Sequence, residues 1–453
     1  MNLFTFVVYI FFVICFFVPS TAYAYLDPGT GNALIYVLLS LLGAVIYFIK
    51  GFLYKITKRK SEEEENGKVD FNKKNIVLFS EGKIYWNTFK PIVEKLLEKQ
   101  QPFCYYTMDI EDPCLTIANR LMDNRFIGDG TGAYAKIGNL SANLVISTTP
   151  NIGTKGYPIP RSKKINKLIY VSHGFDDMAF LHRGSLDNYD IVLLMGDIEE
   201  PNIRKLEELR NLPKKELIPA GLPYLDDLIK GENSYTYSSR ERVRAITNSE
   251  CKNESVTVLL APSWGEKGFL KVLGVSFIEE LAKKKFNIII RPHPYSLKVE
   301  KKLVNDSQKK LKYFNNIKWD FNTDGSHSFR EADILISDYS AVRLDFAFVY
   351  QKPFITIPIS LSQESLQDFE IADLGTSWIE DHINEIGYTL KDGEIDSLES
   401  IIIRILREKS RSDILEFRNK HVYNLGVSGE VIADYLIERN VLLTQMAQET
   451  NVQ

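Results

Sequence analysis

The segment "DILISDYSAVRLDF", residues 333–346, joins a strand pattern directly to a helix pattern. Residues 334–336 are a short apolar run of the kind that forms a buried strand. The polar residues 337–340 follow, and the chain then becomes apolar again, so we expect a helix that begins at or just after Ser340. The residues expected on its buried face are Leu344, Phe348 and Val349. A strand followed at once by a helix is the building unit of parallel α/β sheets.

The same unit recurs along the whole chain, which predicts an α/β fold with two Rossmann-like domains. Strand-like runs lie at 75–80, 102–108, 143–148, 167–172, 190–195 and 216–220, and then at 256–262, 286–292, 316–321, 333–337 and 353–359. These two sets predict an N-terminal domain over 73–233 and a C-terminal, donor-binding domain over 255–425. The polar stretch 234–254 between them is the candidate hinge, and a closing helix is expected over 426–453.

Composition and charge exclude several classes of protein. The chain has 453 residues with 55 Lys and Arg against 59 Asp and Glu, so it lacks the basic excess that nucleic-acid binding requires. The four cysteines form no CxxC pair, and no metal-ligand spacing is present, so we expect reduced cysteines and no metal site. The glycine-rich "GDGTG", residues 128–132, follows no clear strand and lacks the lysine of a phosphate loop, which favours a turn.

The N-terminus predicts attachment to a membrane. Residues 1–24 are apolar and end in Ala-Tyr-Ala, which fits either a cleaved signal peptide or a first membrane helix. Residues 32–54 are long and apolar enough for a transmembrane helix, and the lysines and arginine of 50–60 mark its cytoplasmic side. Residues 61–72 form a charged linker. Both interpretations place the catalytic domains in the cytoplasm, at the inner face of the cell membrane.

Four polar strand tips are candidates for chemistry, because ligands of doubly wound sheets bind beyond the carboxyl ends of the strands. The tips are "SHGFDD" from Ser172, "APSWG" from Ala261, "RPHP" from Arg291 and "SDYS" from Ser337. His173 can act as a general base near neutral pH, or it can simply bond a loop carbonyl. Gly174 lets the backbone turn sharply beneath a ligand.

The "RPHP" and "SDYS" tips both suit an anion. Arg291 offers paired donors to a phosphate, while Pro292 and Pro294 hold His293 in an extended segment. A helix that begins near Ser340 would present its free N–H groups to a phosphate. Asp345 lies about one turn into that helix, within reach of a hydroxylated ligand, although a surface charge is an equally ordinary role for it.

Taken in order, these motifs resemble the CDP-glycerol glycerophosphotransferase family, over about Leu168 to Tyr350. Members of that family have the GT-B fold, in which two Rossmann-like domains face a cleft, and they build or prime poly(glycerol phosphate) polymers such as teichoic acids. Their HG, "GxPRxD", "APTWR", "RxHP" and "SDYSSxxFDF" motifs correspond here to His173-Gly174, "GLPYLDD" from Gly221, "APSWG", "RPHP" and "SDYSAVRLDF".

The resemblance implies site residues and a reaction. The residues implied as catalytic are His173 and His293, and those implied as donor-binding are Gly174, Ser263, Arg291, Ser337, Asp338, Ser340, Ala341 and Asp345. The implied reaction is attack by an acceptor hydroxyl on the glycerol-bearing phosphorus of CDP-glycerol, with CMP as leaving group and without a metal or another cofactor. The acceptor would be a cell-surface polymer or its lipid-linked precursor.

Two other functions stay open at this point. One is a GT-B glycosyltransferase or UDP-sugar epimerase of surface polysaccharide synthesis, and the other is a non-catalytic, membrane-tethered relative. The chain departs from the family pattern where Phe175, Asp176 and Asp177 follow the HG motif, where Gly265 replaces an arginine, and where Ala341 replaces a serine. Arg343 stands where an apolar residue is common, so it either compensates for Gly265 or faces solvent.

Overall fold

The computed structural model describes residues 74–175, 177–233, 256–266, 268–284, 286–322, 325–359 and 366–450. The predicted N-terminal segments at 1–24, 32–54 and 61–72 lie outside these residues, as does the candidate hinge at 234–254. Within the described part, no helix is both long enough and apolar enough to cross a membrane.

The first half of the described chain forms a parallel sheet whose strands follow the order β3-β2-β1-β4-β5-β6-β7. These strands are β1 (Ile76–Ser80), β2 (Phe103–Thr107), β3 (Met122–Phe126), β4 (Ala142–Ser147), β5 (Ile165–Val171), β6 (Ile191–Leu194) and β7 (Glu216–Pro219). The strand order reverses between β1 and β4, which pair in parallel. Such a topological switch point opens a crevice at the carboxyl ends of the two strands.

The second half repeats the pattern, with strand order β10-β9-β8-β11-β12-β13. Its strands are β8 (Thr257–Ala261), β9 (Asn287–Ile290), β10 (Ile317–Trp319), β11 (Ile334–Ser337), β12 (Phe354–Thr356) and β13 (Gly387–Thr389). Here β8 and β11 form the switch point. The prediction of two parallel α/β domains is confirmed, and every strand predicted from the sequence is present with ends shifted by a few residues.

Helices connect the strands of both sheets. They are α3 (Trp86–Glu98), α4 (Gly130–Gly138), α5 (Glu199–Leu209), α6 (Tyr224–Asn233), α8 (Phe269–Leu273), α9 (Ser276–Lys283), α10 (Ser296–Val299), α11 (Lys301–Leu311), α12 (Ser326–Glu331), α13 (Val342–Tyr350), α15 (Ile371–Leu374), α16 (Trp378–His382), α17 (Leu398–Glu408), α18 (Arg411–His421) and α19 (Ser428–Thr450). Short 3₁₀ turns are η1 (Lys83–Tyr85), η2 (Pro113–Thr116), η3 (Met178–Phe180), η4 (Ile383–Glu385) and η5 (Glu394–Ser397).

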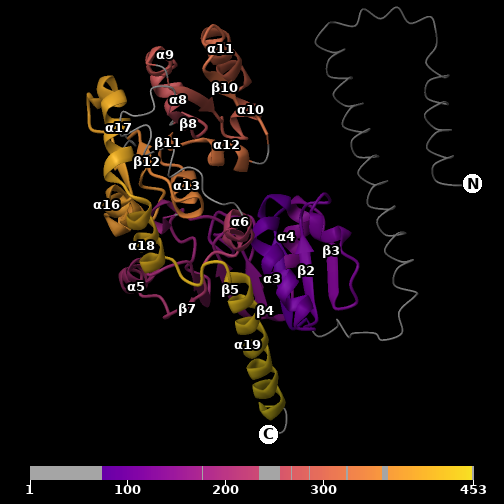
Figure 1. Ribbon diagram of the computed structural model, residues 1–453. Helices are drawn as coiled ribbons and strands as arrows, with labels where there is room; N and C mark the ends of the chain where they lie inside the picture. Colours follow the sequence, from indigo (N-terminus) through magenta and orange to yellow (C-terminus); the bar gives the residue numbers. More distant parts are fainter. Residues whose placement is uncertain are drawn as a thin grey trace, which may run out of the picture. The chain divides into compact units, whose positions relative to one another are not determined.

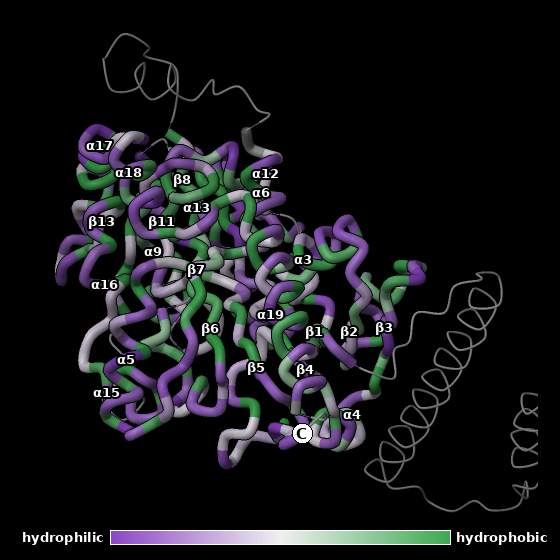
Figure 2. The backbone as a smooth tube through the Cα atoms, turned by 90° about the horizontal axis from the view of Figure 1, so that it is seen from below, coloured by the Kyte–Doolittle hydropathy of each residue, from purple (hydrophilic) through white to green (hydrophobic). Residues whose placement is uncertain are grey.

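Burial of apolar strands between helices produces the cores of both domains. The strands β6 and β8 are apolar and belong to the hydrophobic interior, whereas hydrophilic stretches are frequent in outlying segments such as those near α15 and α17 (Figure 2). All four residues of β6 are buried, which explains their continuous apolar run, since both faces of a parallel sheet are covered. On α3 the buried residues Phe89, Ile92, Val93 and Leu96 recur at intervals of three and four, so one face of this helix packs on the sheet.

The last helix, α19, returns to the first domain, where it packs beside α3 and β4 (Figure 1). Its residues Ile432, Ala433 and Leu436 join the same hydrophobic cluster as β1. At its start Gly429 touches Pro91, and a Cβ at Gly429 would lie 2.6 Å from the Pro91 Cβ atom. This close approach requires glycine, so α19 closes the fold of the first domain although it is last in sequence. The limits predicted for the domains stay predictions.

The sequence analysis missed two edge strands, β3 and β13. The β3 segment reads "MDNRF" and the β13 segment has only three residues, so neither has the apolar run that marks a covered strand. Missing β3 made the interpretation of residues 128–132 wrong as well. This glycine-rich stretch directly follows β3, and its last three residues form the first turn of α4.

Candidate functional site

The carboxyl edge of the first sheet brings together a carboxylate, a hydroxyl and a histidine from three strands. Glu81 follows β1, Thr149 lies just beyond β4, and His173 lies just beyond β5. The Thr149 hydroxyl donates to Glu81 Oε2 at 3.0 Å, across the switch point. The sequence analysis missed Glu81 and Thr149, although the rule that selected His173, a polar residue just after an apolar run, applies to both.

His173 is exposed at this edge, and its ring lies against Tyr85 of η1. The two ring centroids are 5.0 Å apart with an interplanar angle of 84°, so Tyr85 meets the imidazole edge to face. Beneath it, the Ser172 hydroxyl donates to the Gly174 carbonyl at 2.7 Å and stabilises the turn that carries the histidine. The structure thus presents an exposed His173 on an anchored turn, and its catalytic role stays a prediction.

The carboxyl edge of the second sheet carries a matching set: Asp338 after β11, Ser263 after β8 and His293 after β9. Asp338 is only 1% exposed, and its Oδ2 atom accepts hydrogen bonds from the Ser263 N–H at 3.0 Å and the Phe269 N–H at 3.1 Å. The Ser263 hydroxyl donates to its other oxygen, Oδ1. Asp338 therefore holds the loop after β8 in shape, and the predicted donor contacts of Asp338 and Ser263 stay predictions.

His293 is partly buried and has a defined orientation. Its Nδ1 atom accepts a hydrogen bond from the Tyr295 N–H at 3.1 Å, which leaves the ring proton of the neutral form on Nε2. Burial lowers the pKa of His293, against the opposing charges of Asp338 and Glu300. A neutral imidazole with Nε2–H is a hydrogen-bond donor that fits a phosphate oxygen.

Arg291 and the remaining residues of the "SDYS" tip are already engaged within the protein. The Arg291 guanidinium pairs with Asp320 at 2.7 Å and lies over the Phe329 ring. Ser337 is completely buried, and its hydroxyl donates to the Ala261 carbonyl at 2.6 Å, which ties β11 to β8. Direct contacts of Arg291 with a diphosphate stay a prediction, whereas the Ser337 side chain lies inside the sheet and is closed to a ligand.

The helix after this tip begins where the sequence predicted. α13 starts at Val342, after the N-cap Ala341, and its Leu344, Phe348 and Val349 are buried as expected. The Ser340 hydroxyl accepts from the Val342 N–H at 3.4 Å. Asp345 accepts a hydrogen bond from the Tyr224 hydroxyl of α6, so this acid joins α13 to the first half of the chain. Donor contacts of Ser340, Ala341 and Asp345 stay predictions.

Arg343 does not face solvent, so that alternative is wrong. It is 3% exposed, its Nη2 atom lies 2.9 Å from Glu380, and its Nη1 atom donates to Thr356 at 2.9 Å. An arginine buried in this way is stable because its charge and its donors have partners. At Gly265 φ is +84°, a backbone conformation that glycine adopts freely and arginine rarely does.

The residues that replace the family's usual sequence after the HG motif connect the two domains. Phe175 is 1% exposed and packs with Phe348 of α13, with ring centroids 5.0 Å apart. Asp177 accepts from the Ser377 hydroxyl at 2.7 Å and from the Ile379 N–H at 3.0 Å, at the start of α16. The loop that carries His173 is therefore fastened to the C-terminal domain within a few residues of the histidine.

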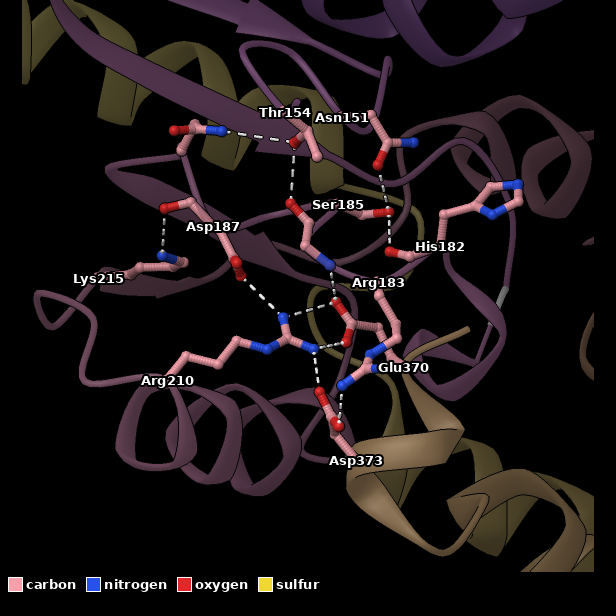
Figure 3. A network of polar contacts seen from close by, with 12 residues as sticks. Asn151, Thr154, His182, Arg183, Ser185, Asp187, Arg210, Lys215, Glu370 and Asp373 are labelled. Carbon is pink, nitrogen blue, oxygen red and sulfur yellow. Dashed lines mark hydrogen bonds and ion pairs between the residues drawn. The ribbon is translucent and has the colours of Figure 1, made fainter. Parts of the chain in front are cut away.

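A network of ion pairs fastens the same loop further along the chain (Figure 3). Arg210, just after α5, reaches Glu370, Asp373 and Asp187, with Nη2 2.6 Å from Asp373 and Nη1 2.9 Å from Asp187. Glu370 also accepts the Gly184 N–H at 2.9 Å. Because Glu370 is 2% exposed and fully paired, the network is a structural fastening rather than an open ligand site.

Metal binding finds no support in the side chains that the structure describes. Among these residues, no three His, Cys, Asp or Glu side chains come close enough to hold a metal ion. Near the second edge, Arg291 contributes positive charge and His293 contributes a hydrogen-bond donor.

Comparison with known proteins agrees with this fold. The family model described as CDP-glycerol:poly(glycerophosphate) glycerophosphotransferase matches residues 66–362. The solved structure of the wall teichoic acid polymerase TagF is similar at 17% sequence identity and a TM-score of 0.50, over 88% of this chain and 99% of that chain. The UDP-GlcNAc 2-epimerase of Methanocaldococcus jannaschii, in complex with UDP-GlcNAc and UDP, is similar at 15% identity and a TM-score of 0.50, over 80% of this chain and 99% of that one. No curated protein matches the chain by sequence.

Proposed function

Because the chain belongs to the CDP-glycerol:poly(glycerophosphate) glycerophosphotransferase family, a family of enzymes, we propose that it transfers glycerol phosphate or a similar polyol phosphate from a CDP-activated donor. The acceptor is a hydroxyl of a cell-surface polymer of the teichoic-acid kind or of its lipid-linked precursor. The observation that carries the proposal is the pair of strand-tip histidines, His173 beyond β5 and His293 beyond β9, each beside a carboxylate at the switch point of its sheet.

In the proposed reaction the acceptor oxygen forms a bond to the glycerol-bearing phosphorus. The bond from that phosphorus to the bridging oxygen of the diphosphate breaks, and CMP leaves with that oxygen. His173 takes the proton of the acceptor hydroxyl, which requires a neutral imidazole at the start of the step. Phosphoryl transfer needs mainly positioning and charge stabilisation, so few other groups have to act chemically.

His293 and Arg291 serve the donor side in this proposal. The lowered pKa of His293 keeps its ring neutral, so Nε2–H can donate to an oxygen of the diphosphate without first losing a proton. Arg291 adds positive charge behind it, and Asp320 fixes the direction of the guanidinium. Donors fixed in advance cost little reorganisation when charge develops on the leaving group.

The test is release of CMP by the full-length protein from CDP-glycerol or CDP-ribitol in the presence of a lipid-linked acceptor. We expect release by the native protein and a fall of about 10²- to 10⁴-fold in His173→Ala, the range for loss of a general base. No release from either donor would overturn the proposal. If the His173→Ala variant kept the full function of the protein in cells, this result would instead favour the non-catalytic relative.

Thermal shift measurements separate the proposal from a UDP-sugar enzyme. A ligand at 100 times its Kd stabilises the folded state by about 2.7 kcal/mol, so the correct nucleotide raises the melting temperature measurably. We expect CDP to stabilise the protein and UDP to have a much smaller effect. Stabilisation by UDP alone would favour the glycosyltransferase or epimerase.

We further propose that residues 32–54 anchor the enzyme in the cell membrane with both domains on the cytoplasmic side. The support is the uncharged stretch 32–49 and the basic residues 50–60 that follow it, near which a lipid-linked acceptor would be presented. Alkaline carbonate should leave the full-length protein in the membrane fraction. Protease added to intact spheroplasts should spare both domains, and their digestion would refute this orientation.

A further inference from the structure

The register of the first sheet aligns Glu81 with the strand tip that carries His173. Phe79 of β1 pairs with Ser147 of β4, and Ser147 pairs with Tyr170 of β5. Two residues further along each segment, just beyond the ends of these strands, come Glu81, Thr149 and Ser172, and His173 is next. Neighbouring strands are about 4.8 Å apart, so a long side chain from the first strand of this row can act on the third.

The side chains confirm that this row is connected. Thr149 follows β4, the strand between β1 and β5. It is buried, and its hydroxyl donates to Glu81 Oε2 at 3.0 Å. The Tyr189 hydroxyl donates to the Thr149 carbonyl and fixes the backbone of that residue. On the other side, the chain continues from Glu81 into η1, whose Tyr85 lies edge-on to the His173 ring. Tyr85 thus lies against the imidazole, and Glu81 comes four residues earlier in the same short segment.

The charges of Glu81 and His173 are coupled. Burial raises the pKa of Glu81 above its usual range, and the hydrogen bond from Thr149 and the charge of His173 act in the opposite direction. A positive imidazole therefore favours the ionised form of the Glu81 carboxylate. The other titratable groups near this pair are Tyr85 and Tyr189, with Asp109 and the pair Lys83–Glu111 further along the edge.

We propose that Glu81 is a positioning residue for His173: its carboxylate, held by Thr149, stabilises the imidazolium that forms when His173 takes the proton of the acceptor hydroxyl. This inference rests on the proposed function of His173 and deepens it. The proton moves from the acceptor oxygen to the imidazole and stays there while CMP leaves. Glu81 contacts neither substrate in this scheme and exchanges no proton.

The pH profile of CMP release tests the proposal, because a base must be neutral and its acidic limb reports its ionisation. Without the negative charge, the imidazolium is less stable. In Glu81→Gln we therefore expect the acidic limb to move down by about one pH unit and kcat to fall about tenfold. Glu81→Asp should recover part of both effects. The matched control is Glu111→Gln, which removes an exposed carboxylate from the same edge and should change neither quantity.

A second measurement keeps this inference separate from the proposed function. The histidine ring signals of the isotope-labelled full-length protein are titrated by NMR, and His173 is assigned by its loss in His173→Gln. We expect the midpoint of His173 to fall by about one pH unit in Glu81→Gln and to stay unchanged in Glu111→Gln. An inactive wild-type protein with this shift would refute the proposed function but support the Glu81–His173 coupling. An unmoved midpoint would refute the coupling, whatever the activity.

Discussion

The two sheets carry the same three kinds of group at or next to their switch points, but the carboxylate is buried in the second sheet and partly exposed in the first. In the second sheet Asp338 is 1% exposed, and its two oxygens accept from the loop after β8. In the first sheet Glu81 is partly exposed, its Oε2 atom accepts from Thr149, and the charge of His173 acts to lower the pKa of Glu81. A carboxylate surrounded by donors from one loop fixes that loop, whereas a carboxylate held at one oxygen can still influence a neighbouring base.

The two histidines also differ in exposure, in the same direction as the carboxylates. His293 is partly buried beside a carboxylate that is already engaged, and burial lowers its pKa, which suits a neutral donor to a phosphate. His173 is exposed beside Glu81, which suits a group that gains a proton during the reaction. In the proposed reaction, these two similar strand-tip arrangements serve the two substrates, the donor at the second sheet and the acceptor at the first.

The largest effect on stability is expected from Asp338→Ala. This substitution leaves the Ser263 N–H, the Ser263 hydroxyl and the Phe269 N–H without their acceptor, and loss of a buried, hydrogen-bonded charge costs about 3–5 kcal/mol. Denaturant unfolding should show this loss, and the CDP-induced thermal shift should disappear with it. Asp338→Asn keeps one acceptor oxygen and should lose less. A stable Asp338→Ala protein that still binds CDP would show that the loop does not depend on this carboxylate.

The next effect concerns Glu199, a third carboxylate, which is the first residue of α5 and follows β6 in the chain. It is 3% exposed and accepts the Met195 N–H at 2.6 Å, and burial raises the pKa of Glu199 to about 8. Because its folded pKa lies above the unfolded value of 4.5, the protein loses stability as the pH rises from about 4.5 to about 8. The loss is on the order of a few kcal/mol.

Glu199→Gln removes this titration and keeps an oxygen for the Met195 N–H. The melting temperature of the variant should therefore fall less than that of the wild type between pH 5 and pH 8. Glu111→Gln, on the exposed edge, is the control and should follow the wild type. Parallel curves for wild type and Glu199→Gln would mean that Glu199 is ionised throughout this range.

Most of the fold could be predicted from the sequence, because parallel strands that helices cover on both faces need continuous apolar runs. The tips after β5, β8, β9 and β11 were readable for a related reason, since polar residues follow those runs without a linker. The hydrogen-bond partners of the residues at the strand tips could not be predicted from the sequence. Asp338 binds Ser263 and Phe269, which are 75 and 69 residues away, and nothing local in the sequence indicates this. Glu81 was missed because polar residues beyond β1 were not considered.

The roles of the residues that depart from the family pattern were the hardest to predict without the structure. From the sequence, Phe175 and Asp177 were departures from the family motif, and Arg343 was expected either to compensate for Gly265 or to face solvent. In the structure Phe175 and Asp177 join the domains, and Arg343 is buried against Glu380 of α16. Such side chains cannot be interpreted from sequence spacing, because their partners come from a different part of the chain, brought near only by the packing of the two domains.

The smallest effects are expected from a matched pair of substitutions, each of which removes the hydroxyl that donates to a switch-point carboxylate. This pair compares the two sheets directly. Ser263→Ala removes a donor from buried Asp338, and Thr149→Val removes one from partly exposed Glu81. A hydrogen bond to a charged group contributes about 1.5–3 kcal/mol, and water can replace the lost donor only at an accessible carboxylate. We expect Ser263→Ala to lose about 1.5–3 kcal/mol and Thr149→Val less than about 1 kcal/mol in denaturant unfolding.

The two variants should also differ in the pH profile of CMP release, where Thr149→Val should have the larger effect. Thr149→Val frees Glu81 to change its position, so the acidic limb assigned to His173 should move, while Ser263→Ala should leave that limb in place because Asp338 acts on the donor loop. The Ser263 and Tyr189 hydrogen bonds that involve backbone atoms remain in both variants, so neither result reflects a collapsed loop. Equal losses of stability together with equal pH profiles would mean that the two switch points are chemically alike, and the division of roles between Glu81 and Asp338 would then be wrong.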